Sequence, residues 1–300
     1  MKKKTYLFAL MAMALTLGSC SDNENGIGGE TSKYITVSTS IGNMTRVATD
    51  EKGGQTFEEG DEISVYAWTG DATVAPETRE RVVNNAINKL TNGSWISNPQ
   101  MLWKNNRDKH YFIGVYPISA ISELSAGEYT FDETKQVESD LLVAVNKDGL
   151  SYNVDEQQPV PLTFTHVMAK LVVNLTYKNQ WGGIPTVEKV VVGNAAKEAT
   201  INYLTKVVTP STTAKEDFSL PEITENTKYV SVIIPQEDVK QLTIVIGGKN
   251  FVYDNGTPFK LESGKITTVN LEVGRDEIKL GDVKITNWED GSTFSGEALN

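Results

Sequence analysis

The residue with the most distinctive chemistry is Cys20, because it is the only cysteine among the 300 residues. A lone thiol cannot form a disulfide within its own chain, but its sulfur can carry an acyl group. The charged start Lys2–Lys4 and the apolar run Tyr6–Leu17 precede it, and that run is too short to cross a bilayer as a helix. Gly18 and Ser19 are small enough for a peptidase to reach the bond before Cys20. The pattern predicts an export signal that ends at Cys20.

The order Leu17-Gly18-Ser19-Cys20 resembles the lipobox of bacterial lipoproteins. The resemblance implies cleavage before Cys20, a diacylglycerol thioether with further chains such as palmitate, and a lipid anchor in the outer membrane. An ordinary secretory signal with a chance cysteine is the alternative. Residues 21–32 are polar and Gly-rich, which predicts a flexible tether. Asp22 and Glu24 resemble the surface-export signal of Bacteroidetes lipoproteins, although a solvated linker explains them equally well.

Side chains suited to catalysis are few. His110 and His166, the two histidines, both lie in apolar strand patterns without a serine elbow or metal-ligand spacing, so we interpret them as core or interface residues. Ser139-Asp140 has no histidine in a recognisable arrangement. Paired carboxylates of a glycosidase form only in the fold, so 39 acidic residues neither support nor exclude one. We therefore expect no enzyme, no cofactor and no metal site.

The net charge and the aromatic residues limit which partners are possible. A net charge of −11 argues against nucleic acid, which is bound through clustered Lys and Arg. Aromatic side chains in strands more often pack in a core than stack on sugars, but stacking on a surface glycan stays open for the five tryptophans. These are Trp68, Trp95, Trp103, Trp181 and Trp288.

The elements that position these residues are short strands. Tyr34–Ile41 alternates strictly, with Ile35, Val37, Thr39 and Ile41 on one side, which predicts a half-buried strand. We prefer a strand to a short helix for Val82–Leu90. Further strands are expected at Glu62–Trp68, His110–Tyr116, Tyr129–Phe131, Leu141–Val145, twice within Val160–Tyr177, and at Val187–Val192, Ala199–Asn202, Tyr229–Ile234, Leu242–Ile246, Phe251–Tyr253, Ile266–Val273 and Ile278–Ile285.

Many short strands with regular turn signals, and no long helical period after the signal, predict an all-β protein of sandwich type. Asn179–Pro185 breaks the strand pattern with two glycines and a proline, so we place a domain boundary there. The predicted organisation is a lipoprotein signal peptide at 1–20, a tether at 21–32, an N-terminal sandwich at 33–180 and a C-terminal sandwich with a terminal strand at 181–300.

The chain resembles the fimbrillin family of Bacteroidetes surface lipoproteins. The resemblance implies a fold of two transthyretin-like (Ig-like) β-sandwiches in tandem. It also implies that the chain is a stalk, tip or accessory subunit of a pilus that supports adhesion. The matching pieces are the lipobox, Thr45-Arg46 after the first strand, Phe57…Gly60-Asp61 with Val65-Tyr66-Ala67, Trp103…Phe112…Tyr116-Pro117, Ser139–Leu142, Leu162–His166 with Ala169-Lys170-Leu171, Gly264-Lys265 with Thr268–Leu271, and Trp288–Gly291.

The resemblance also implies a mechanism of assembly. In the family, a trypsin-like protease cuts after an arginine beyond the first strand, and a strand of another subunit fills the vacated groove. Here that arginine is Arg46, and the cut would separate it from Val47 in a Gly-rich connection. Burial of Ile35, Val37 and Ile41 at about 1.5–3 kcal/mol each would keep an uncut strand in place. An exposed loop arginine that is never processed is the alternative.

The closing segment Glu277–Trp288 is the candidate donor strand, although Asp282 interrupts its alternation and the segment could equally dock on its own domain. The expected partners are other fimbrial subunits and the outer membrane, with surface glycans or proteins as adhesion targets. A monomeric, glycan-binding surface lipoprotein is the alternative function.

Overall fold

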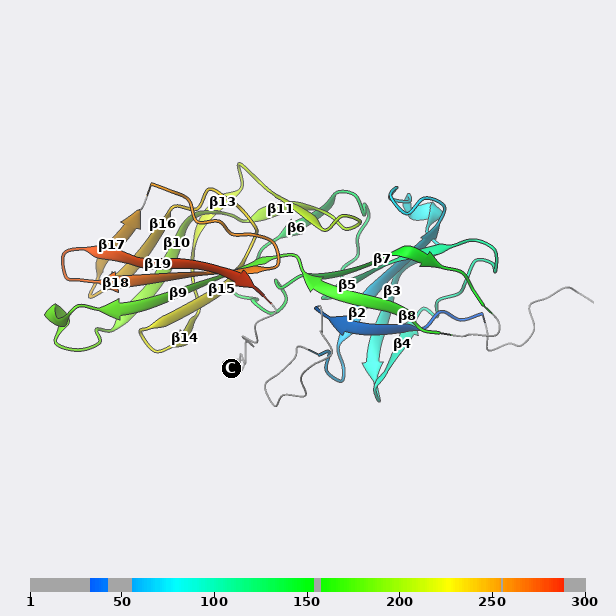
Figure 1. The fold of residues 1–300 in the computed structure, drawn as a ribbon, viewed down its shortest axis with the longest axis horizontal. Coiled ribbons are helices and arrows are strands. Elements are labelled where there is room, and N and C mark those ends of the chain that lie inside the picture. Colours follow the sequence, from blue (N-terminus) through cyan, green and yellow to red (C-terminus); the bar gives the residue numbers. More distant parts are fainter. Residues whose placement is uncertain (1–32, 43–55, 154–157, 255, 289–300) are drawn as a thin grey trace, which may run out of the picture.

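The computed structural model describes residues 33–42, 56–153, 158–254 and 256–288. This part of the chain is nearly all β, with short 3-10 helices at Thr78–Glu80 and Asn179–Trp181. Figure 1 shows an elongated molecule with a seven-stranded sheet at one end and sheets of four and five strands at the other. The predicted all-β class is confirmed.

The seven-stranded sheet carries the N-terminal half, in the order β1-β8-β7-β5-β2-β3-β4. Its end strands β1 and β4 also contact each other, so the sheet curls around an apolar core. The prediction of a strand rather than a short helix at Val82–Leu90 is confirmed. The strands are β1 (Val37–Ile41), β2 (Glu62–Thr69), β3 (Val83–Thr91), β4 (Ser94–Asn98), β5 (His110–Tyr116), β7 (Leu142–Leu150) and β8 (Val160–His166).

Two sheets build the C-terminal half, in the orders β13-β10-β16-β17 and β14-β15-β9-β18-β19. Alternating apolar residues from both sheets share one buried cluster, which is how two packed sheets exclude water. The first sheet contains β10 (Val187–Ala196), β13 (Lys215–Ser219), β16 (Gln241–Ile246) and β17 (Lys249–Asp254), and the second contains β9 (Ala169–Tyr177), β14 (Glu222–Thr224), β15 (Lys228–Ile233), β18 (Lys265–Val273) and β19 (Ile278–Asn287).

A three-stranded sheet ties the halves together, because β6 (Gly127–Thr130) from the first half pairs with β11 (Glu198–Asn202), which also pairs with β12 (Val207–Pro210). Tyr66 and Trp68, on the outer face of the seven-stranded sheet, belong to the same apolar cluster as the C-terminal sheets. The C-terminal core therefore continues onto the outer face of the seven-stranded sheet, whereas the inner face of that sheet encloses a separate apolar cluster.

The chain passes from one half to the other at Val167 and Met168, between β8 in the seven-stranded sheet and β9 in the five-stranded sheet. Both residues are buried, so no polar turn marks the crossing in the sequence. The pattern break at Asn179–Pro185 instead contains a 3-10 helix and a loop between β9 and β10. A division into two tandem domains at 180–181 stays a prediction.

Candidate functional site: the slot of the first strand

The first strand closes the seven-stranded sheet along two sides. β1 runs parallel to β8, with Val37 opposite Val160 and Ile41 opposite Phe164. At its start, Ile35 N–H donates to the Met101 carbonyl at 3.0 Å. In the segment after β4, Trp103 N–H donates to the Lys33 carbonyl at 3.1 Å. Because it bonds to β8 on one side and to this segment on the other, the stretch from 33 to 42 fills a slot between them.

Inward side chains plug this slot, as the alternation predicts. Ile35 is 2% exposed and Val37 is 6% exposed, whereas Thr36 and Ser38 face solvent. Ile41 is only half-buried, so the burial energy rests on two side chains and amounts to about 3–6 kcal/mol. The slot's inner surface consists of apolar side chains from β2, β3, β5, β7 and β8, with Trp95 of β4 and Met101.

Phe57 covers one end of the slot, immediately after residues 43–55, which lie outside the described ranges. Its ring packs edge-on against Trp95, Tyr116 and Phe164 at centroid distances of 5.3, 5.3 and 5.1 Å. Gly114 makes room for Phe164, because a Cβ at that position would lie 2.6 Å from the end of the Phe164 ring. These aromatic contacts pack Phe57 against three strands of the sheet, β4, β5 and β8.

His110 holds the other wall of the slot. Its Nε2 accepts the Lys104 N–H at 3.1 Å, which leaves Nδ1 as the donor to the Asp108 carbonyl at 3.1 Å. Trp103 packs edge-on against this imidazole at 4.9 Å and donates its backbone N–H to Lys33 O at 3.1 Å. His110 is a core residue, as the sequence indicates, and positions the segment that receives the start of the first strand.

Burial lowers the pKa of His110, so the fold favours the neutral imidazole. An unfolded histidine has a pKa of about 6.5, so as the pH falls below that value the unfolded chain takes up a proton that the folded chain refuses. We expect the melting temperature to fall between pH 7.5 and 5.5, and to fall less in His110→Gln, whose amide oxygen still accepts from Lys104. Thermal unfolding at the two pH values checks this, and equal losses in both proteins would contradict it.

The last strand lies on its own half of the molecule. β19 pairs antiparallel with β18 at the edge of the five-stranded sheet, and most of its side chains are exposed, including Val283 and Ile285. Trp288, at its end, is 3% exposed and stacks on His166 at 4.2 Å. His166 Nδ1 in turn lies 2.8 Å from Asp140 Oδ1. The closing segment is thus docked by a buried tryptophan at the junction of the two halves.

The predicted modification sites Cys20, Arg46 and Val47 lie outside the described residues. Met101–Trp103 and Phe57 belong to the slot, a role that the sequence did not predict: Phe57 and Trp103 entered only as part of the family resemblance, and Trp103 also as a residue that could stack on a glycan. Of the tryptophans, Trp68 and Trp95 are buried, like Trp288. The described ranges hold no group of three or more His, Cys, Asp or Glu side chains arranged to bind a metal ion. No helix within them is long and apolar enough to span a membrane.

Comparison with known proteins decides the family. A model described as fimbrillin-like matches residues 45–288. The chain belongs to the fimbrillin-like family. This fimbrillin-like chain is 24% identical to a Bacteroides uniformis protein named as a fimbrium subunit, Fim1C, over 97% of each chain.

Solved structures show the same fold for this fimbrillin-like protein. A crystal structure named for a cell adhesion protein of Bacteroides uniformis superposes with a TM-score of 0.63 at 19% identity, over 85% of this chain and 99% of the other. One from Bacteroides ovatus, also named for a cell adhesion protein, gives 0.62 at 18% identity, over 85% and 98%.

Proposed function

We propose that this fimbrillin-like chain is a subunit of a fimbrium that reaches the cell surface anchored in the outer membrane by acyl chains on Cys20, and that it then assembles by strand exchange once the lipidated N-terminal segment has been cut off. In this proposal, cleavage between Arg46 and Val47 separates the first strand from the fold, and a strand of another subunit takes its place in the slot. The assembled fimbrium supports adhesion.

The observation that carries this proposal is the position of the first strand. It is an end strand of its sheet, yet Ile35 and Val37 belong to the core. Its covalent link to the rest of the described fold, which continues at Thr56, is the stretch 43–55. A single cut in that connection turns the plug into a separate peptide whose site offers main-chain bonds and alternate apolar pockets to a new strand.

The donor is Glu277–Trp288 of another subunit. In this chain the segment extends β18 at an edge of its sheet, where most of its side chains are exposed, and the buried Trp288 is the anchor that must be released before the segment can leave. Ile278 and Leu280 are half-buried, and Val283 and Ile285 continue the apolar series after Asp282. The bulge opposite Val269 and Leu271 absorbs the break in alternation.

Arg46→Ala is expected to abolish both the cut and the heat-stable ladders that strand exchange produces on a gel. Intact-mass measurement of protein from the cell surface reports the cut and the acylation of Cys20 together. Arg79→Ala is the matched control, because it removes an arginine whose side chain is 78% exposed, in the short 3-10 helix Thr78–Glu80. Ladders that persist in Arg46→Ala, or a wild-type surface form that starts only at lipidated Cys20, would contradict the proposal.

A further inference from the structure

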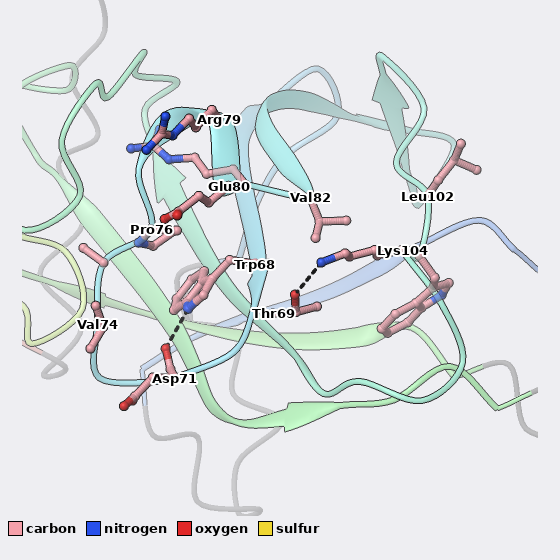
Figure 2. Close-up of a pocket in the computed structure, with 13 residues that line it drawn as sticks. Trp68, Thr69, Asp71, Val74, Pro76, Arg79, Glu80, Val82, Leu102 and Lys104 are labelled. Atoms are coloured by element: carbon pink, nitrogen blue, oxygen red, sulfur yellow. Dashed lines mark hydrogen bonds between the residues drawn. The ribbon is translucent and has the colours of Figure 1, made fainter.

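We propose that a hollow beside the start of the first strand binds an acidic saccharide, meaning a sugar that carries a carboxylate. The hollow has a volume of about 780 Å³, within the range of ligand pockets, which is about 300–1,000 Å³. Figure 2 shows its walls, formed by the end of β2, the connection from β2 to β3, and the segment at Leu102–Lys104.

A buried cation without a counter-ion lines this hollow. Arg81 is 9% exposed, and its guanidinium donates to the carbonyls of Ile121 at 2.7 Å and Ser122 at 2.6 Å and to Asn84 Oδ1 at 2.8 Å. Its Nε is buried and has no acceptor among the described residues. No described carboxylate forms an ion pair with it, and burial lowers its pKa. Its hydrogen-bond acceptors and the Tyr66 ring, 5.4 Å from the guanidinium carbon, are neutral, so no described carboxylate balances this positive charge.

A second cation stands at the same hollow. Lys104 is exposed, and its Nζ donates to the Thr69 hydroxyl at 3.3 Å, the contact drawn in Figure 2. This partner is neutral, and among the described residues no carboxylate lies within ion-pair distance of Lys104. Two cations without counter-ions therefore line one hollow of a protein whose net charge is −11.

The acidic groups of the hollow are engaged within their own loop. Asp71 Oδ1 accepts from the backbone N–H and the hydroxyl of Thr73, both at 2.7 Å, and these bonds lower the pKa of Asp71. Glu80 Oε2 accepts from the Glu77 N–H at 3.1 Å, and Glu77 also pairs with Arg79 at 2.9 Å. Lys104 thus remains to pair with a ligand anion, and the positive charge of Arg81, whose hydrogen-bond partners are all neutral, adds to the attraction.

The remaining lining suits the apolar face of a sugar ring. Leu102 and Val74 are 45% and 59% exposed, Trp103 is half-buried, and Pro76 completes the lining. An extended peptide is disfavoured because β2 is paired on both sides, by β3 and β5, and presents no free edge for main-chain bonds. A compact ligand with a carboxylate fits the charges and the apolar lining together.

Calorimetric titration of the full mature protein with trigalacturonate in low salt tests this proposal. We expect binding, with neutral galactotriose at least tenfold weaker, because a hydrogen bond to a charged group contributes about that factor. Lys104→Gln should weaken trigalacturonate binding about tenfold. Lys89→Gln is the matched control, since it removes the same charge from an exposed lysine of β3 that pairs with Glu62. Thermal unfolding checks that both variants fold.

The proposal would be overturned if trigalacturonate did not bind or if neutral galactotriose bound equally well. Equal effects of Lys104→Gln and Lys89→Gln on trigalacturonate binding would also overturn it. Triglutamate that binds as tightly and depends equally on Lys104 would show a peptide site instead. The proposal does not depend on strand exchange, because the hollow is complete in the uncut chain. Failure of Arg46→Ala to stop assembly would leave it untouched.

Discussion

Ile35→Asp is expected to expel the first strand from its slot and to lower the free energy of unfolding by at least about 3–5 kcal/mol. Ile35 is 2% exposed among apolar side chains, so an aspartate there would be a buried charge without a partner. Hydrogen exchange at residues 33–42, together with urea denaturation, measures both effects.

Thr36→Asp is the control for this prediction, because Thr36 is the exposed neighbour on the same strand. Its free energy of unfolding should stay within about 0.5 kcal/mol of the wild-type value, as for most surface substitutions. Equal losses in the two variants would mean that the first strand does not plug the core.

Trp288→Ala is expected to lower the free energy of unfolding by about 3–5 kcal/mol and to speed hydrogen exchange along β19. Trp288 is 3% exposed, stacks on His166, and has the Lys170 ammonium 5.1 Å from its ring centroid. Removing the indole leaves a cavity at the junction of the halves and releases the end of the last strand. Urea denaturation and hydrogen exchange measure the two effects.

Ile285→Ala is the control on the same strand, because Ile285 is 39% exposed. We expect its free energy of unfolding to change by much less than that of Trp288→Ala. If both variants lose the same stability, the last strand is held along its length rather than by its tryptophan.

Alternation and turn residues predicted most strands, because these signals are local. The strand His110–Tyr116 was predicted at its observed bounds. Strands β4, β12, β13 and β14 were missed. β13 has the sequence KEDFS, which carries little apolar pattern, and it forms because β10 offers a long pairing partner. Such a strand is specified by its neighbour rather than by its own residues.

Pairing between distant segments could not be predicted. The parallel register of β1 on β8 joins residues more than a hundred positions apart, and the bond from Ile35 to Met101 follows only from the curl of the sheet. The hollow could not be predicted either, because Arg81 and Lys104 come to line it only in the folded chain. The buried crossing between the halves at Val167 and Met168 contains no turn residues that could mark it in the sequence.

The most direct test of the central claim, that the first strand is a replaceable plug, is uptake of a labelled copy of that strand. The protein is cut after Arg46, incubated with excess fluorescent peptide of residues 33–42, and separated by native gel. We predict that the cut protein retains the peptide, whereas the uncut protein and a peptide with Ile35→Asp and Val37→Asp give no uptake. Equal uptake by cut and uncut protein, or equal retention of the two peptides, would contradict the account.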